Sequence, residues 1–164
     1  MELQQQNVYI LEENTLPAIK LKNFLHKKFK DTLNISMFTD GASLIKKIDA
    51  STAIAIIDYE LKGEQTDELI SKIKRINANT KVIALASDEE IAAAITDHRK
   101  GIKNVVVKGK GELKRIHTIL LTMLYYPVRI IQRFFGFQEL AAIFIVEILF
   151  VGIVVILGFE FLRN

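Results

Sequence analysis

Cysteine is absent from the 164-residue sequence, and histidine occurs only three times. Without cysteine, neither a disulfide framework nor a cysteine-rich zinc site can form. The histidines, at positions 26, 98 and 117, lack the close spacing of metal ligands. Strong net charge is also missing: it is +3, and the lysines alternate with acids rather than forming a stripe. We therefore expect no disulfide, no zinc site and no nucleic-acid partner.

Charged residues are scarce only in the C-terminal part of the chain. Residues 1–117 have the mixed composition of a globular domain, whereas residues 118–164 contain six charged side chains, three of each sign. This uneven distribution predicts one domain followed by a segment of a different kind.

Five short runs in the first part are rich in Ile and Val and are mostly unalternating, which is typical of strands that are covered on both faces. The runs are Asn7–Leu11, Asn34–Phe38, Ala53–Ile57, Lys81–Ala86 and Asn104–Val107. Helical patterns separate them, and a fifth helix is expected to start near Glu112. Alternation of five strands with five helices predicts an α/β fold with an open, doubly wound parallel sheet.

Charged side chains follow several of these strands directly. Glu12 and Glu13 end the first strand, Asp58 ends the third with Glu60 just beyond, and Lys108 follows the fifth. Ligands of such sheets bind at the carboxyl ends of the strands. Clustered carboxylates suit Mg²⁺, and a lysine suits a phosphoryl group. We therefore expect Asp58 to be a nucleophile toward a phosphoryl donor. The alternative is that these acids only cap helices.

Four stretches, VYILEEN, AIIDYELKGEQTDEL, KVIALAS and GIKNVVVKG, resemble the signature stretches of response-regulator receiver (CheY-like) domains. The resemblance covers about residues 7–124 and implies a flavodoxin-like sheet of order 2-1-3-4-5. It implies phosphorelay signalling without enzymatic activity beyond self-phosphorylation and autodephosphorylation. A histidine kinase or another phosphodonor is the implied upstream partner.

The resemblance also assigns roles to individual residues. Asp58 would be the phosphoacceptor and Lys108 would contact the phosphoryl oxygens. Mg²⁺ would be bound by Asp58, by Glu13 directly, by Glu12 through water and by Glu60 through its backbone carbonyl.

The sequence departs from the receiver pattern at the positions that report phosphorylation. Ala86 stands where a Ser or Thr is expected, and Ser87, one residue later, is a possible substitute. Val105 replaces the aromatic switch residue, and Gly109 replaces the proline after the lysine. A pseudo-receiver that works as a phosphorylation-independent scaffold in a membrane complex is therefore the alternative function.

Residues 140–159 contain a single charged side chain, Glu147. At about 1.5 Å per residue, twenty helical residues span roughly 30 Å, the thickness of the hydrocarbon core. Arg129 and Arg133 precede this run, which favours a cytoplasmic N-terminal domain. Pro127 is expected to break the fifth helix. The alternative is a buried oligomerisation helix in a soluble protein.

The predicted organisation is a receiver-like domain over 1–124, an interfacial segment over 125–138 and a transmembrane helix over 139–162. This arrangement predicts a single-pass protein of the inner membrane whose output is a protein contact. Glu147 would cost about 2.5–3.5 kcal/mol to insert. It would face lipid in its protonated form, hydrogen-bond within a homo-oligomer, or pair with another membrane protein. A ring of such acids in an ion-conducting assembly is a further possibility.

Overall fold

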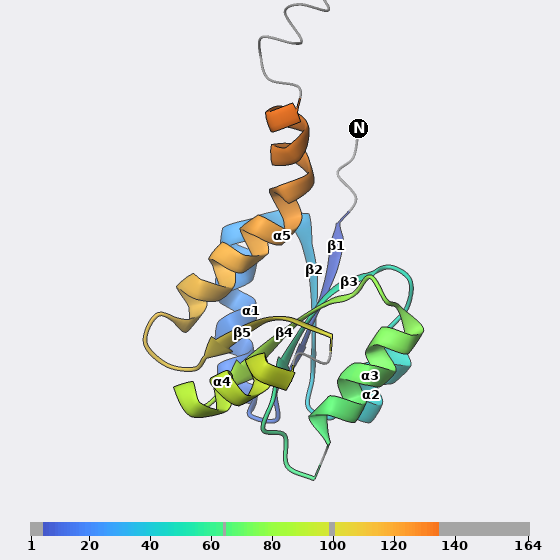
Figure 1. Ribbon diagram of the computed structural model, residues 1–164, viewed down its shortest axis with the longest axis vertical. Coiled ribbons are helices and arrows are strands. Elements are labelled where there is room, and N and C mark those ends of the chain that lie inside the picture. The colour runs from blue at the N-terminus through green and yellow to red at the C-terminus, as the bar shows by residue number, and fades with distance from the viewer. Residues whose placement is uncertain (1–4, 64, 99–100, 135–164) are drawn as a thin grey trace, which may run out of the picture. The chain divides into compact units, whose positions relative to one another are not determined.

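The computed structural model describes residues 5–63, 65–98 and 101–134 (Figure 1). Five parallel strands form one sheet in the order β2-β1-β3-β4-β5. The strands are β1 (Gln6–Leu11), β2 (Leu33–Phe38), β3 (Thr52–Asp58), β4 (Lys81–Ala86) and β5 (Ile102–Val107). The predicted doubly wound sheet and its strand order are confirmed, and each strand differs from its predicted bounds by two residues at most.

Five α-helices and one short 3₁₀ helix connect the strands. They are α1 (Thr15–Phe29), η1 (Lys30–Thr32), α2 (Gly41–Lys47), α3 (Thr66–Ile76), α4 (Glu89–His98) and α5 (Glu112–Phe134). Polar side chains fix several helix starts: Asn14 accepts from the Leu16 amide, Asp40 from the Ser43 amide, and Asp88 from the Ile91 amide. Such caps satisfy amides that have no partner within the helix.

Apolar side chains cover both faces of the sheet. On one face, α2 and α3 pack against residues of β1 and β3, including Leu11 and Ile57, and α4 packs against Ala84 and Ala86 of β4. On the other face, the ring of His117 in α5 lies 5.3 Å from that of Phe29 at the end of α1. Burial on both faces explains why the strands lack alternation.

The strand order reverses between β1 and β3, which lie side by side although β2 comes between them in the sequence. The loops after β1 and β3 therefore diverge to opposite sides of the sheet at the carboxyl ends of these strands, which is where open α/β sheets bind ligands. The acids after the two strands lie at this point of the fold.

The expected break of the fifth helix at Pro127 is wrong, because α5 continues through this residue to Phe134. Proline removes one backbone hydrogen bond and crowds the preceding turn, but the turns on either side keep their own bonds. Arg129 and Arg133 therefore lie within α5.

Within the part of the chain that the structure describes, no helix is long and apolar enough to span a membrane. The predicted span 139–162, including Glu147, lies outside the described residues. The chain separates into two compact units, residues 1–119 and 120–164, and the acids at the carboxyl ends of β1 and β3 belong to the first.

Candidate functional site

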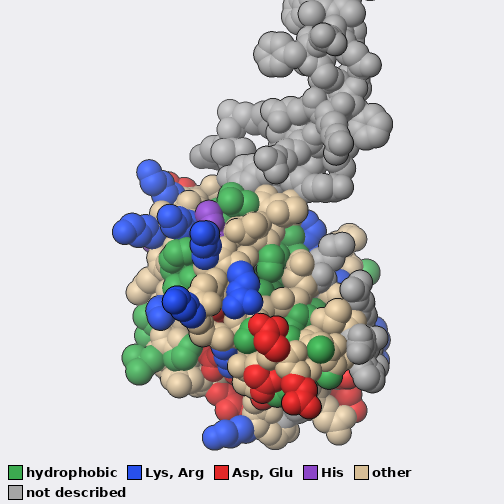
Figure 2. Space-filling view, turned by 60° about the vertical axis from the view of Figure 1, so that its left-hand side comes forward, with side chains coloured by type: hydrophobic (Ala, Val, Ile, Leu, Met, Phe, Trp, Pro, Cys, Tyr) green, Lys and Arg blue, Asp and Glu red, His purple; other side chains and the backbone are tan. Residues whose placement is uncertain are grey.

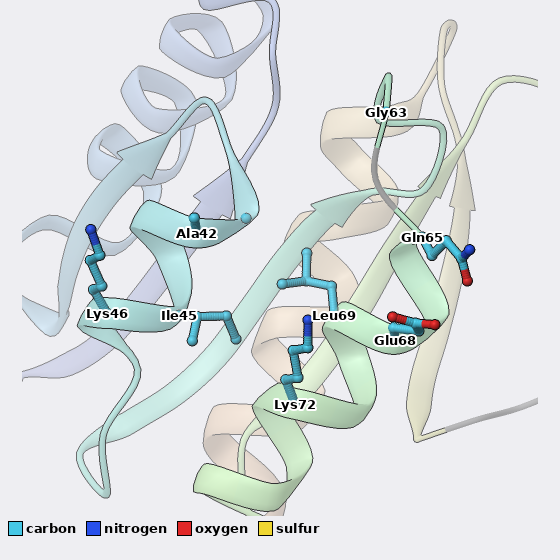
Figure 3. Close-up of a pocket in the computed structure, with 9 residues that line it drawn as sticks. Ala42, Ile45, Lys46, Gly63, Gln65, Glu68, Leu69 and Lys72 are labelled. Atoms are coloured by element: carbon cyan, nitrogen blue, oxygen red, sulfur yellow. The ribbon is translucent and has the colours of Figure 1, made fainter.

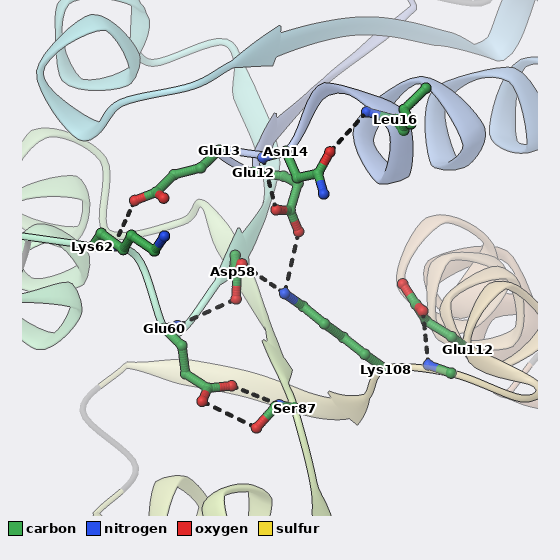
Figure 4. A network of polar contacts seen from close by, with 11 residues as sticks. Glu12, Glu13, Asn14, Leu16, Asp58, Glu60, Lys62, Ser87, Lys108 and Glu112 are labelled. Atoms are coloured by element: carbon green, nitrogen blue, oxygen red, sulfur yellow. Dashed lines mark hydrogen bonds and ion pairs between the residues drawn. The ribbon is translucent and has the colours of Figure 1, made fainter.

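Two buried carboxylates and one ammonium meet at the carboxyl edge of the sheet (Figure 4). Lys108 Nζ lies 2.6 Å from Asp58 Oδ2 and 3.2 Å from Glu12 Oε2. Glu12 is only 6% exposed and Asp58 only 7%. The three side chains come from β1, β3 and β5 or the residue that follows each, so the parallel topology alone brings them together. The predicted nucleophile, Asp58, thus lies beside the predicted lysine, Lys108, whereas the predicted phosphoryl transfer stays a prediction.

The remaining carboxylate oxygens of this cluster accept hydrogen bonds from the backbone. Asp58 Oδ1 accepts from the Glu60 amide at 3.2 Å, and Glu12 Oε1 accepts from the Asn14 amide at 3.1 Å. Every carboxylate oxygen of the pair thus has a donor, as buried ionised groups require. The bonds fix the orientation of both carboxylates toward Lys108.

The pKa of Lys108 reflects competing effects. Burial lowers it, but the hydrogen bond and the negative charge of Asp58, together with Glu12, outweigh burial and leave the pKa above its ordinary value. An opposite charge at this range favours the charged form of a group. Lys108 is therefore a permanent cation at neutral pH, and the cluster holds two carboxylates against one ammonium.

Glu13 does not join this cluster. Its carboxylate accepts a hydrogen bond from the backbone amide of Lys62, in the loop after β3, and the residue is exposed. The structure thus brings together Asp58, Lys108 and Glu12 but turns Glu13 to the loop. Across the described residues, no group of three or more acidic, histidine or cysteine side chains is arranged to hold a metal ion.

The donor set nevertheless fits a hard divalent cation in its chemistry. The carboxylates of Glu12 and Asp58 supply oxygen ligands only, the donor type that Mg²⁺ prefers, and their charge exceeds that of Lys108 by one unit. Glu13 would reach the same ion only after leaving the Lys62 amide. The role of the Glu60 backbone carbonyl stays a prediction.

The Glu60 side chain has a role that the sequence did not reveal. Its two oxygens accept from the Ser87 amide at 2.7 Å and from the Ser87 hydroxyl at 3.0 Å. Figure 4 shows the Ser87 hydroxyl turned to Glu60 rather than to Asp58. We call this pair of bonds the Glu60–Ser87 clamp. It ties the loop after β4 to the loop after β3, and both residues are exposed. The adjacency of β3 and β4 was the only signal for it.

A second concavity lies between α2 and α3 (Figure 3). Its volume is about 570 Å³, Ile45 and Leu69 supply apolar walls, and Lys46, Glu68 and Lys72 lie on the helices around it. Its charges have both signs, and its lining contains no pair of a nucleophile and a base. The chemistry of the domain therefore concentrates at the Asp58 cluster.

No protein-family model and no curated protein matches the chain. Solved structures do match. A signal receiver domain from Vibrio parahaemolyticus aligns with a TM-score of 0.62 and 21% identity over 73% of this chain and 90% of that one. A CheY-like receiver domain from Methanospirillum hungatei JF-1 aligns with a TM-score of 0.62 and 14% identity, over 73% and 94% of the two chains. A two-component response regulator from Clostridium difficile aligns with a TM-score of 0.63 and 17% identity, over 73% of this chain and 96% of that one. The chain has the receiver fold.

Three departures from the usual receiver sequence have structural correlates. Gly109, which replaces a proline, has φ +110°, and its amide donates to Glu112 Oε2 at 3.0 Å. Proline allows neither this φ nor this bond. Ala86 is fully buried against α4, in the cluster that Val105 also joins. Small apolar residues thus occupy both positions where receivers place their reporting side chains.

Proposed function

We propose that this receiver fold accepts a phosphoryl group on Asp58 and passes the signal on through protein contacts. One observation carries the proposal: the buried Asp58 carboxylate lies 2.6 Å from the Lys108 ammonium at the point where the strand order reverses. A buried acid that is held this way at a ligand-binding edge suits nucleophilic chemistry. The receiver resemblance of the flanking stretches supports the same role.

The reaction would form one bond and break one. A carboxylate oxygen of Asp58 attacks phosphorus, and the bond between phosphorus and the leaving group of the donor breaks. The leaving group keeps the electron pair, and the product is an acyl phosphate. Lys108 then pairs with the phosphoryl oxygens as a point charge. Mg²⁺ bound by Glu12 and Asp58 would neutralise charge on the transferred group.

The donor would be a histidine kinase or a small phosphorylated metabolite. α1 starts beside the site, and its exposed residues Leu16 and Ile19 are 77% and 40% exposed. An exposed apolar pair on a helix next to the acceptor suits a docking partner. We propose no activity beyond self-phosphorylation and autodephosphorylation.

Membrane attachment is part of the same proposal. The apolar run 140–159 has the length of a single span, and Arg129 and Arg133 precede it. These features support an inner-membrane protein with a cytoplasmic receiver domain. The span would also contact a second copy or another membrane protein, with Glu147 as a polar contact.

A phosphorylation-independent scaffold is the second candidate. The Glu60–Ser87 clamp favours it, because the hydroxyl nearest in sequence to the reporting position is already bound. In that case the loop after β4 would hold one conformation whatever happens at Asp58.

Fluoroberyllate, a non-covalent analogue of the phosphoryl group, separates the two candidates. The full chain in detergent should give bound fluorine NMR signals in the presence of Mg²⁺, and Asp58→Asn should abolish them. Bound signals with no change in the Ser87 amide would show an acceptor site without a conventional response. The absence of bound signals from the wild type would favour the scaffold.

A further inference from the structure

Basic side chains gather where the helices of the receiver fold end. Each helix after a strand starts at the carboxyl edge of the sheet and ends at the opposite side, which we call the amino edge because the strands begin there. Three successive helices have basic last turns: His26, Lys27 and Lys28 in α1, Lys46 and Lys47 in α2, and Lys74 and Arg75 in α3. Lys30 follows α1 directly.

Acidic side chains gather at the other end. Besides the buried pair at the site, the carboxyl edge carries the acids Glu13, Asp40, Glu60, Asp67, Glu68, Asp88, Glu89, Glu90 and Glu112, against the cations Lys62, Lys108, Lys110, Lys114 and Arg115. Figure 2 shows one face on which Lys and Arg side chains gather around a histidine, with a group of Asp and Glu side chains below them. The first 119 residues are therefore electrically polarised along the strands, although the net charge of the chain is only +3.

The helix dipole explains the sign of charge at each helix end, since cations stabilise a helix C-terminus. The dipole of a single helix does not account for the gathering of all three basic turns at one edge. Because the sheet is parallel, all three basic turns point to the same edge, where Asp31 and Asp49 are the acids of the adjoining loops. The amino edge is therefore a basic surface, even though the helix dipole accounts for each lysine separately.

The chain leaves the first unit at this edge. The His117 ring of α5 lies 6.2 Å from the Phe24 ring and 5.3 Å from the Phe29 ring, and Phe29 is the last residue of α1. By residue 117, α5 has thus reached the end of α1, and the first unit ends at residue 119. The apolar run begins about twenty residues further on in the sequence.

From this juxtaposition we infer that the amino edge of the domain docks on an anionic lipid surface and holds the Asp58 edge away from the bilayer. The inference rests on the proposed membrane attachment. Lysines spread over three helix ends suit a fluid layer of phosphate headgroups, and the neighbouring exit of the chain favours lipid over a nucleic acid or an acidic protein. A lysine near such a surface strengthens binding by about fivefold, and the attraction fades within about 10 Å. Docking in this orientation leaves the phosphoacceptor open to a donor.

The absence of cysteine allows a test with a single label on the full chain. Ala78→Cys places an environment-sensitive fluorophore on the exposed loop between α3 and β4, at the amino edge. Ala42→Cys places it on the exposed start of α2, at the carboxyl edge. Each protein is reconstituted in vesicles of phosphatidylcholine, alone or mixed with phosphatidylglycerol, that carry a headgroup quencher. We expect stronger quenching at position 78 than at position 42, and only in the anionic vesicles.

Charge reversal gives the matched comparison. Lys27→Glu with Lys47→Glu removes two exposed lysines from the amino edge, and the docked fraction relative to the undocked should fall at least about tenfold. Lys62→Glu with Lys110→Glu makes the same change of charge at the carboxyl edge and should leave quenching unaltered. Equal effects of the two pairs, or quenching at position 78 that ignores lipid charge, would overturn the inference. So would binding of DNA by the amino edge without any response to lipid.

Flotation separates this inference from the proposed attachment. Protein that stays with neutral vesicles in high salt but shows no charge-dependent quenching supports the membrane span and overturns docking. Protein that binds only anionic vesicles, in a salt-sensitive manner that the Lys27 and Lys47 reversals abolish, supports docking and overturns the span.

Discussion

Replacing Lys108 with methionine should destabilise the domain, because it leaves the two buried carboxylates of Glu12 and Asp58 without their shared cation. Methionine keeps the length of the side chain and most of its apolar contact area. Removing one partner from a fully buried ion pair costs about 3–5 kcal/mol. The Lys108 side chain is 31% exposed, so water screens part of the effect. We expect a loss of about 2 kcal/mol in the free energy of unfolding at pH 7.

The companion variant Asp58→Asn should cost much less, below about 1 kcal/mol, because it removes one charge and leaves Lys108 paired with Glu12. Lys110→Met is the matched control, since Lys110 is exposed and lies two residues away. The measurement is urea unfolding of the detergent-solubilised chain, followed by circular dichroism.

Addition of Mg²⁺ should recover part of the loss in Lys108→Met if Glu12 and Asp58 together hold the ion. A Lys108→Met protein within about 0.5 kcal/mol of the wild type at neutral pH would refute this reasoning. So would equal losses in Lys108→Met and Lys110→Met.

Three further outcomes follow from the described contacts. Glu60→Ala should speed hydrogen exchange of the amide at position 87 by at least about tenfold, because the amide loses its acceptor. Ser87→Ala keeps the amide bond to Glu60 and should change this exchange rate less. Asn77→Ala removes bonds from its amide to the carbonyls of Asp49 and Thr52 and should cost about 1–3 kcal/mol in thermal or urea unfolding, with exposed Asn79→Ala as the near-neutral comparison. Burial and the Asp67 hydrogen bond raise the pKa of Tyr59, as Asp58 raises that of Lys108, so stability should fall as the pH rises above about 10. Tyr59→Phe should reduce this fall of stability with pH. An unchanged dependence of stability on pH would contradict the contribution of Tyr59.

The sheet was predictable because its signal is repeated. Each strand is a short run of Ile, Val and Ala bounded by polar residues, and burial on both faces leaves little ambiguity in such runs. The strands differ from prediction mainly at their ends: β5 begins at Ile102 rather than Asn104, next to an irregularity in its register with β4. The strand order came from the resemblance and not from the pattern.

The site was predictable in its residues but not in its contacts. The sequence places Glu12 and Glu13 side by side and gives no means to decide which one turns inward. The structure buries Glu12 beside Lys108 and leaves Glu13 on the Lys62 amide. The choice depends on how the chain turns after β1, which is a tertiary property. The Glu60–Ser87 clamp was not predictable for the same reason, since it joins residues 27 positions apart in two loops.

The failed expectation at Pro127 shows the limit of a local rule. Proline disfavours a helix interior by about 3 kcal/mol, yet α5 continues to Phe134. The penalty falls at a single turn of a long helix, and the turns on either side keep their own backbone hydrogen bonds.

The intact mass of the full chain reports directly whether Asp58 accepts a phosphoryl group. The protein is incubated with Mg²⁺ and a small acyl phosphate, and the sites of modification are mapped after proteolysis. We expect a gain of one phosphoryl group on Asp58 that Asp58→Asn abolishes and that hydroxylamine removes, as it does from acyl phosphates. No gain in the wild type, or a gain that persists in Asp58→Asn, would contradict this expectation.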